Sequence, residues 1–132
     1  YPDLLAGNVS LMFENMLSML PNAKSGKVRA LAVTGTKRSA AMPEVPTVAE
    51  SVPGFSAVGW YGVLAPAGTD AAIVNKLSAE INRILKLPEV NERLSSLGAE
   101  PTGSTPEEFA AHIRAEIAKW GKVVRDSGAR ID

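Results

Sequence analysis

The chain has 132 residues, a length that suggests one ordinary domain and that can bury a core without metal or disulfide support. Basic and acidic residues balance at 14 each, so no basic excess argues for a nucleic acid or an anionic membrane as partner. The absence of cysteine excludes disulfides and thiolate chemistry, and no apolar run reaches the length of a transmembrane helix.

The first third of the chain is predicted to form a strand, a helix and a second strand. Residues 9–13 are a short apolar run expected to be a buried strand, and residues 28–33 are rich in small and β-branched side chains. Between them, residues 15–23 carry apolar positions suited to a weak helix. Because such crossovers are right-handed and join parallel strands, we expect a βαβ unit in an α/β fold, with helices on the faces of a mainly parallel sheet.

A polar, proline-containing connection over residues 34–46 leads to a short helix. Thr47 and Glu50 have the spacing of a capping box, so the helix is expected over about residues 48–52. Residues 55–64 follow as a third strand, and the two glycines inside it indicate a bend or a close backbone approach.

Helices dominate the prediction for the second half of the chain. The first is expected to begin at the N-cap Thr69, with Asp70 favouring its start, and to continue to about Leu87. A proline begins the next helix, over residues 88–97, and Gly98 is suited to the position after its end.

The last helix has the clearest start signal. Thr105 and Glu108 form a second capping box with proline at the first helical position, and Gly128 ends a helix expected over residues 106–127. Residues 100–102 are expected as a short strand just before it.

Three segments together resemble one protein family. They are residues 29–34 (RALAVT), 45–50 (VPTVAE) and 59–69 (GWYGVLAPAGT). The combination is similar to the C-terminal part of the extracytoplasmic solute receptors of tripartite tricarboxylate transporters, the TctC or Bug-type family. The resemblance implies the C-terminal part of a type II periplasmic-binding-protein fold. Residues 1–55 would complete one lobe, and residues 56–132 would cross the hinge and return to the other.

The resemblance also implies a function. Such receptors capture a small organic carboxylate outside the cytoplasm, hold it by backbone amides and ordered water, and deliver it to the membrane subunits of the transporter. No cofactor, metal or catalytic residue is expected. Because these receptors are exported and roughly twice this size, we expect a fragment of a periplasmic protein. The alternative is a free-standing small protein. A fragment with an exposed lobe interface could dimerise.

A candidate ligand site lies where the first two predicted strands end. Ligands of open α/β sheets bind beyond the carboxyl ends of the strands, and the next helix N-terminus offers N–H groups to an anion. The expected ligand-binding residues there are Phe13, Asn15, Ser18, Thr34 and Thr36. The alternative is that Asn15 only caps the helix and that residues 34–36 only form a turn.

The acidic residue in this region departs from the family pattern. The family commonly has Phe-Asp-Asn where this chain has Phe13-Glu14-Asn15. A longer carboxylate would repel an anionic ligand unless it points away or holds water, so Asn15 is the stronger candidate.

Trp60 and Tyr61 complete the candidate site. Aromatic side chains with a polar tip suit the wall of a small-molecule pocket, and the resemblance places this pair near the cleft, on the crossover between the lobes. Neighbours on a strand face opposite sides, so both can line one pocket only if the adjacent glycines distort the strand. The alternative is that the pair packs in the core.

The remaining polar residues give no pattern typical of an enzyme or a metal site. His112 is the only histidine, and Glu108 and Glu116 at helical spacing favour a surface pair on the last helix. One histidine with scattered carboxylates gives no metal-ligand spacing. The basic pair Lys37 and Arg38 could contact a carboxylate ligand, although an exposed pair is the simpler interpretation.

Two other classes of function stay open from the residues alone. A hydrolase or transferase built on Glu14 and His112 requires these two side chains to converge in one pocket. A regulatory ligand-sensing domain of the same bilobed architecture predicts an adjoining helix-turn-helix and a basic stripe, and this chain contains neither.

Overall fold

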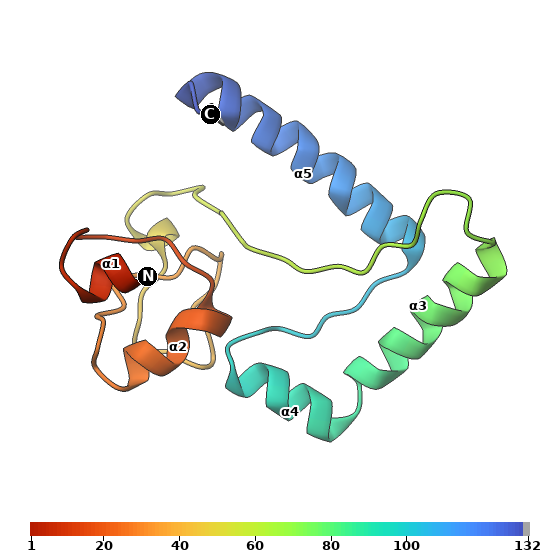
Figure 1. Cartoon of the computed structure of the whole chain (residues 1–132), viewed down its shortest axis with the longest axis horizontal. Coiled ribbons are helices and arrows are strands. Elements are labelled where there is room, and N and C mark those ends of the chain that lie inside the picture. The colour runs from red at the N-terminus through yellow and green to blue at the C-terminus, as the bar shows by residue number, and fades with distance from the viewer. Residues whose placement is uncertain (131–132) are drawn as a thin grey trace. The chain divides into compact units, whose positions relative to one another are not determined.

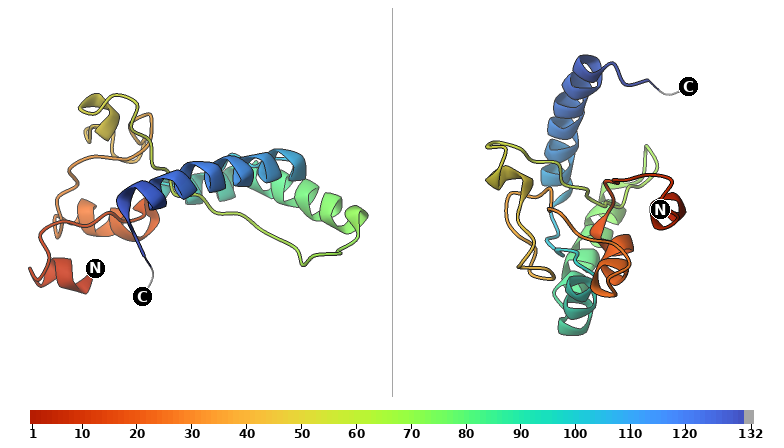
Figure 2. Two further views of the ribbon diagram at one scale, coloured as in Figure 1. Left: turned by 90° about the horizontal axis from the view of Figure 1, so that it is seen from above. Right: turned by 90° about the vertical axis from the view of Figure 1, so that its left-hand side faces the viewer.

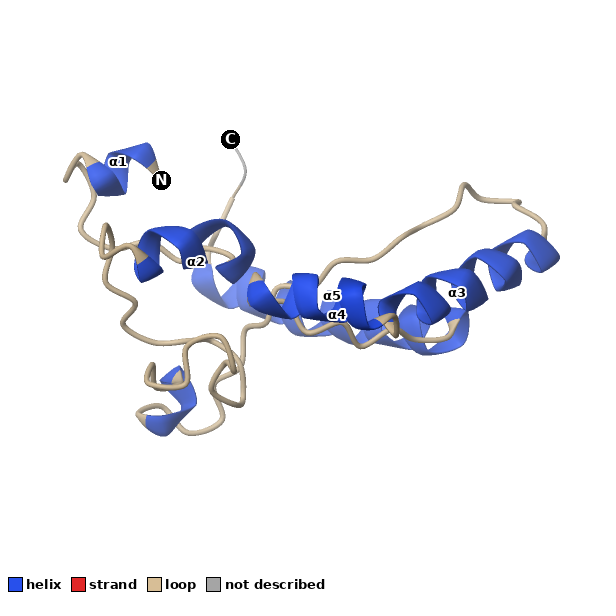
Figure 3. Cartoon of the chain, turned by 90° about the horizontal axis from the view of Figure 1, so that it is seen from below, coloured by secondary structure: helices blue, strands red, loops and turns tan. Residues whose placement is uncertain are grey.

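A computed structural model describes residues 1–130, and the regular structure of these residues is helical (Figures 1 and 3). Contacts divide the chain into two units. The first unit consists of Tyr1–Val63 and Leu87–Pro101, and the second consists of Leu64–Lys86 and the residues from Thr102 onward. The lobe division expected from the sequence, into residues 1–55 and 56–132, concerns a two-lobed receptor and stays a prediction.

The first unit holds three α-helices and one short 3₁₀ helix. These are α1 (Pro2–Leu5), α2 (Met16–Lys24), α4 (Pro88–Ser96) and the 3₁₀ helix η1 (Val48–Glu50). Leu20 of α2, at 3% exposure, and Val45 before η1 are its buried apolar side chains. The end of α4 approaches α2, since a Cβ added to Gly98 would lie 2.5 Å from both Cγ and Sδ of Met16. Glycine suits this position for a second reason, because its φ is +81°.

The predicted strands do not form among the described residues. Residues 9–13, 28–32, 55–64 and 100–102 have no strand structure, and Figure 3 draws them as loops. One isolated parallel bridge joins Val33 to Thr47. The physical reason is that a strand exists only through the ladder it makes with a neighbour, and residues 9–13 and 28–33 do not pair with each other. The mainly parallel sheet is therefore not confirmed in this structure.

The second unit contains α3 (Ala71–Leu85) and α5 (Pro106–Ser127), which contact each other. Figure 2 shows the N-terminal end of α5 beside α3 in both views. Asn82 of α3 joins this helix to the segment just before α5, because its Nδ2 donates to the carbonyl oxygen of Ser104 at 2.9 Å. The same Nδ2 donates to the carbonyl oxygen of Ser78, one turn earlier in α3, at 2.8 Å. None of the helices in residues 1–130 combines the length and apolar character needed to cross a bilayer.

Most helix bounds agree with the sequence predictions because the signals that set them are local. α5 starts with the predicted capping box, in which Thr105 Oγ1 accepts from the Glu108 backbone N–H at 3.2 Å and Glu108 Oε2 accepts from that of Thr105 at 2.8 Å. Gly128, with φ +67°, follows its end as predicted. The short helix after Thr47 is a 3₁₀ turn that ends at Glu50, two residues earlier than expected.

The predicted cap of α3 was wrong. The N-cap is Asp70, whose Oδ1 accepts from the Ala72 backbone N–H at 2.7 Å. The Thr69 hydroxyl instead donates to the carbonyl oxygen of Pro66 at 2.8 Å. The sequence also gave no signal strong enough to predict α1, a helix of four residues that begins at Pro2.

Candidate functional site

Asn15 stands at the N-cap of α2 without using its side chain as a cap. Its backbone N–H donates to Oε1 of the neighbouring Glu14 at 2.8 Å, so this carboxylate turns back onto the chain. The Asn15 side chain instead lies against Gly59, where an added Cβ would be 2.5 Å from Oδ1. The interpretation of Asn15 as an ordinary helix cap therefore does not describe its side chain, which remains exposed at the start of α2.

A second contact joins the loop after residue 33 to the same stretch of chain. The carbonyl oxygen of Thr34 accepts a hydrogen bond from the Ala57 backbone N–H at 3.0 Å. Together with the approach of Asn15 to Gly59, this contact brings residues 13–18, 34–36 and 57–61 close together within the first unit. The structure therefore groups the segments that carry the candidate residues, and their roles in binding stay predictions.

The other candidate residues differ in how far they are exposed. Phe13 is 74% exposed, Thr34 is half-buried and Thr36 is exposed. Ser18 makes a local contact, because its hydroxyl donates to the Asn15 carbonyl oxygen at 2.9 Å. None of these four side chains is part of the buried core of the first unit.

The aromatic pair is also outside the core. Trp60 is 42% exposed and Tyr61 is 72% exposed. Both belong to the first unit, one and two residues after the glycine that Asn15 contacts. In this structure the two rings therefore lie at the surface of the first unit, and their role in binding stays a prediction.

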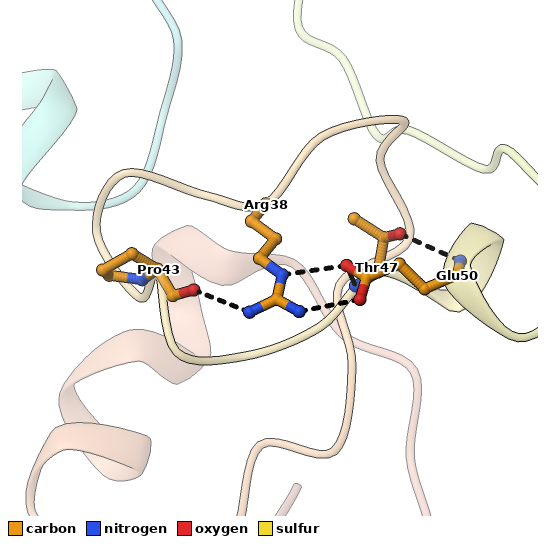
Figure 4. A network of polar contacts seen from close by, with 4 residues as sticks. All are labelled: Arg38, Pro43, Thr47 and Glu50. Carbon is orange, nitrogen blue, oxygen red and sulfur yellow. Dashed lines mark hydrogen bonds and ion pairs between the residues drawn. The ribbon is translucent and has the colours of Figure 1, made fainter.

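A network of polar contacts surrounds Arg38, in the loop that follows residues 34–36 (Figure 4). Nε and Nη2 of Arg38 donate to Oε1 and Oε2 of Glu50 at 2.8 and 2.7 Å, and Nη1 donates to the carbonyl oxygen of Pro43 at 3.3 Å. Glu50 also completes the predicted capping box with Thr47, at 3.0 and 3.2 Å. The sequence prediction did not pair Arg38 with Glu50; opposite charges on either side of one loop are the signal that could have suggested it.

The network changes the acid–base behaviour of Glu50. The Arg38 guanidinium, helped by the Thr47 backbone N–H, lowers the pKa of Glu50 to about 2 from an ordinary 4.5, and the same pairing raises the pKa of Arg38. Since the folded pKa lies below the unfolded one, ionised Glu50 stabilises the fold above about pH 4.5. That contribution is lost progressively as the pH falls from about 4.5 toward 2.

The second unit contains an open depression of about 440 Å³ between α3 and the start of α5. Asn82, Ser78 and Ser104 line it, and these residues already hydrogen-bond to one another. His112 belongs to the same unit, where its ring stacks on Phe109 with the centroids 6.4 Å apart. None of the candidate ligand residues lines this depression. Within residues 1–130, no group of three or more His, Cys, Asp or Glu side chains is placed to hold a metal ion.

Comparison with protein families identifies the chain. A family model described as "Tripartite tricarboxylate transporter family receptor" matches residues 1–129. The chain belongs to this receptor family. Protein BugT of Bordetella pertussis is 42% identical over 130 residues, which cover 98% of this chain and 40% of BugT.

Solved structures of periplasmic binding proteins resemble this chain in fold. "R. palustris Rpa4515 with adipate" matches with a TM-score of 0.90 and 38% identity over 96% of this chain and 43% of that one. The periplasmic binding protein BugD matches with a TM-score of 0.86 and 35% identity, over 96% of this chain and 44% of BugD. MatC from Rhodopseudomonas palustris with bound malate matches at 0.80 and 35% identity, over 93% of this chain and 43% of MatC. The chain thus folds like part of a periplasmic binding protein, and it spans about two fifths of the length of these relatives.

Proposed function

We propose that this chain is part of a periplasmic receptor that binds a small organic carboxylate and delivers it to a tripartite membrane transporter. The observation that carries the proposal is the geometry around Asn15. Its side-chain amide is exposed, makes no capping hydrogen bond to α2 and lies against Gly59. Membership of the receptor family and the titles of two similar structures, with adipate and with malate, support a dicarboxylate ligand.

Neutral groups would hold the carboxylate in this site. Asn15 and Thr36 supply amide and hydroxyl donors, and the backbone of residues 34–36 supplies N–H groups. The Ser18 hydroxyl would support the site indirectly, because it donates to the Asn15 carbonyl oxygen. Arg38 is already bound to Glu50, so the loop does not present that cation to a ligand. Trp60 and Tyr61 would form an apolar wall with polar tips, and Phe13 would add to it. Binding of this kind needs no reaction, so we propose a receptor and not an enzyme.

The first test is a fluorescence titration of this chain with adipate, malate and other mono-, di- and tricarboxylates. A saturable change in tryptophan emission, with a rise in melting temperature, is expected for at least one dicarboxylate. The change should disappear in Trp60→Phe and persist in Trp120→Phe, because Trp120 belongs to α5 in the second unit. A change lost in Trp120→Phe and kept in Trp60→Phe would place binding elsewhere. If neither this chain nor a receptor of full length binds any of the acids, the proposed function is wrong.

We also propose that residues 9–13, 28–33 and 55–64 are strands of a mainly parallel sheet in the complete receptor. The support is the length of the relatives, more than half of which lies outside this chain and would supply neighbouring strands. Apolar side chains that are exposed here, such as Leu11 and Leu31, would then be buried. In that arrangement residues 1–55 belong to one lobe and residues 56–132 cross to the other.

Hydrogen exchange tests the sheet. Backbone amides of residues 28–32 are expected to exchange rapidly in this chain alone and at least about a hundredfold more slowly in a receptor of full length, because ladder hydrogen bonds protect them there. Amides in the middle of α5 serve as the reference, since their helix is complete in this chain. Equal exchange of residues 28–32 in both proteins would contradict the parallel sheet.

A further inference from the structure

Arg38 closes the loop that follows the candidate residues 34–36. Its guanidinium contacts three acceptors, the two carboxylate oxygens of Glu50 and the carbonyl oxygen of Pro43 (Figure 4). A bidentate guanidinium–carboxylate pair fixes orientation as well as distance, because two parallel hydrogen bonds permit only one geometry. The pair therefore holds the chain at residue 38 in a defined position relative to η1, twelve residues further on.

The base of the same loop is fixed by backbone hydrogen bonds. The Val33 N–H donates to the carbonyl oxygen of Pro46, and the Val48 N–H donates to that of Val33, both at 2.9 Å. Between these bonds, Thr47 is buried at 5% exposure. Residues 34–36 thus lie between two anchors, the backbone bridge at residue 33 and the Arg38–Glu50 pair.

We propose that Arg38 and Glu50 are positioning residues for the carboxylate site, which hold residues 34–36 in their binding geometry. This inference rests on the proposed function and adds two residues to that site. In this proposal Arg38 acts through the loop, since Nε, Nη1 and Nη2 each donate to an acceptor within the chain. The charge of Glu50 is matched by Arg38, so the network adds no net charge that would repel an anionic ligand.

Substitutions distinguish this role from direct contact between Arg38 and the ligand. Arg38→Gln and Glu50→Gln are each expected to raise the Kd for adipate or malate by about three- to tenfold. Glu50→Gln retains an oxygen that can accept from the Thr47 N–H, so it keeps the cap. It removes the charge and puts an NH2 donor in place of one of the two oxygens that accept from Arg38. If Arg38 bound the ligand directly, Glu50→Gln would release the guanidinium and leave the Kd unchanged or lower it, which would overturn the proposal.

A double variant and a matched pair supply the controls. Arg38→Gln with Glu50→Gln should weaken binding no more than either single change, since both break the same interaction. Arg38→Lys keeps the positive charge but loses the planar bidentate donors, so it should bind the acids more tightly than Arg38→Gln and more weakly than the unmodified protein. Arg83→Gln and Glu80→Gln break an exposed ion pair in the second unit, at 2.9 Å, and should leave the Kd unchanged.

Hydrogen exchange without ligand tests the positioning role of Arg38 separately from carboxylate binding. In Arg38→Gln, the amides of Val48 and Ala57 should exchange several-fold faster, because they donate to the carbonyl oxygens of Val33 and Thr34, respectively. Amides in α5 should keep their rates. Nuclear magnetic resonance titration should also show the Glu50 pKa rising from about 2 toward 4.5. Unchanged exchange at Val48 and Ala57 would overturn the positioning role. If neither this chain nor a receptor of full length binds any of the acids, the proposed function fails and the carboxylate role of the pair fails with it, whatever the exchange rates show about the loop.

Discussion

Replacing Gly59 by alanine is expected to weaken carboxylate binding at least about tenfold and to change the free energy of unfolding by less than about 1 kcal/mol. An added Cβ would lie 2.5 Å from Oδ1 of Asn15 and 3.7 Å from its Cγ. The backbone at Gly59 is outside the left-handed region, so alanine introduces no backbone strain. The exposed Asn15 amide can rotate away at little cost in stability, but a binding group must keep its geometry to within about 0.5 Å. Calorimetric titration with adipate and malate, beside urea unfolding, measures the two effects separately.

Two further variants test whether Gly59 acts through Asn15. Gly121→Ala is the matched control, because its Cβ would meet only Nη1 of Arg125, at 3.5 Å, and it should leave the Kd unchanged. Since residue 121 is inside α5, this change should also stabilise the helix by up to about 1 kcal/mol. In an Asn15→Ala background, Gly59→Ala should have little further effect on binding. Weakened binding by Asn15→Ala, together with full binding by Gly59→Ala, would show that the contact does not orient the amide.

The side-chain amide signals of Asn15 give a check that needs no ligand. They are expected to shift in Gly59→Ala and to stay in place in Gly121→Ala, since only the first substitution forces the amide to move. This readout addresses the contact itself, whereas the Kd addresses its role in the proposed site.

Elements whose signals are local could be predicted from the sequence. Both capping boxes, at Thr47 and at Thr105, form as predicted, because each depends on two residues three positions apart. The bounds of α4 and α5 follow from a proline at the start and a glycine after the end. The predicted N-cap of α3 was wrong by one residue, since Thr69 and Asp70 are adjacent and both residue types are good N-caps.

Strands and long-range pairs could not be predicted in this way. Whether residues 28–33 form a ladder depends on a neighbour, and a pattern of β-branched residues carries no information on whether that neighbour is present. The Arg38–Glu50 pair depends on the path of a twelve-residue loop, which the sequence does not specify. The expected closeness of residues 13–18 and 34–36 was inferred from strand ends meeting at one edge of a sheet. In the structure these segments are grouped instead by contacts of Asn15 and Thr34 with residues 57–59.

Leu20→Ala is expected to lower the free energy of unfolding by about 2–3 kcal/mol, the low end of the range for buried leucines. Leu20 is 3% exposed, and Val45 is the other buried apolar residue among the residues that the structure describes. The loss should stay near the low end because a lightly packed surrounding can collapse into part of the cavity. Urea unfolding followed by circular dichroism measures the change, and an unaltered dependence on urea would show that the unfolded state is the same in both proteins.

Leu11→Ala is the matched control, and it links this prediction to the proposed sheet. Leu11 is 58% exposed, so the same substitution should cost less than about 1 kcal/mol in this chain. In a receptor of full length, where residues 9–13 are proposed to form a buried strand, its cost should rise toward that of Leu20→Ala. A large loss for Leu11→Ala in this chain alone would contradict the exposure of that segment. A loss well below about 2 kcal/mol for Leu20→Ala would mean that the buried face of α2 does not anchor this helix, because truncating a buried leucine otherwise costs at least about that much.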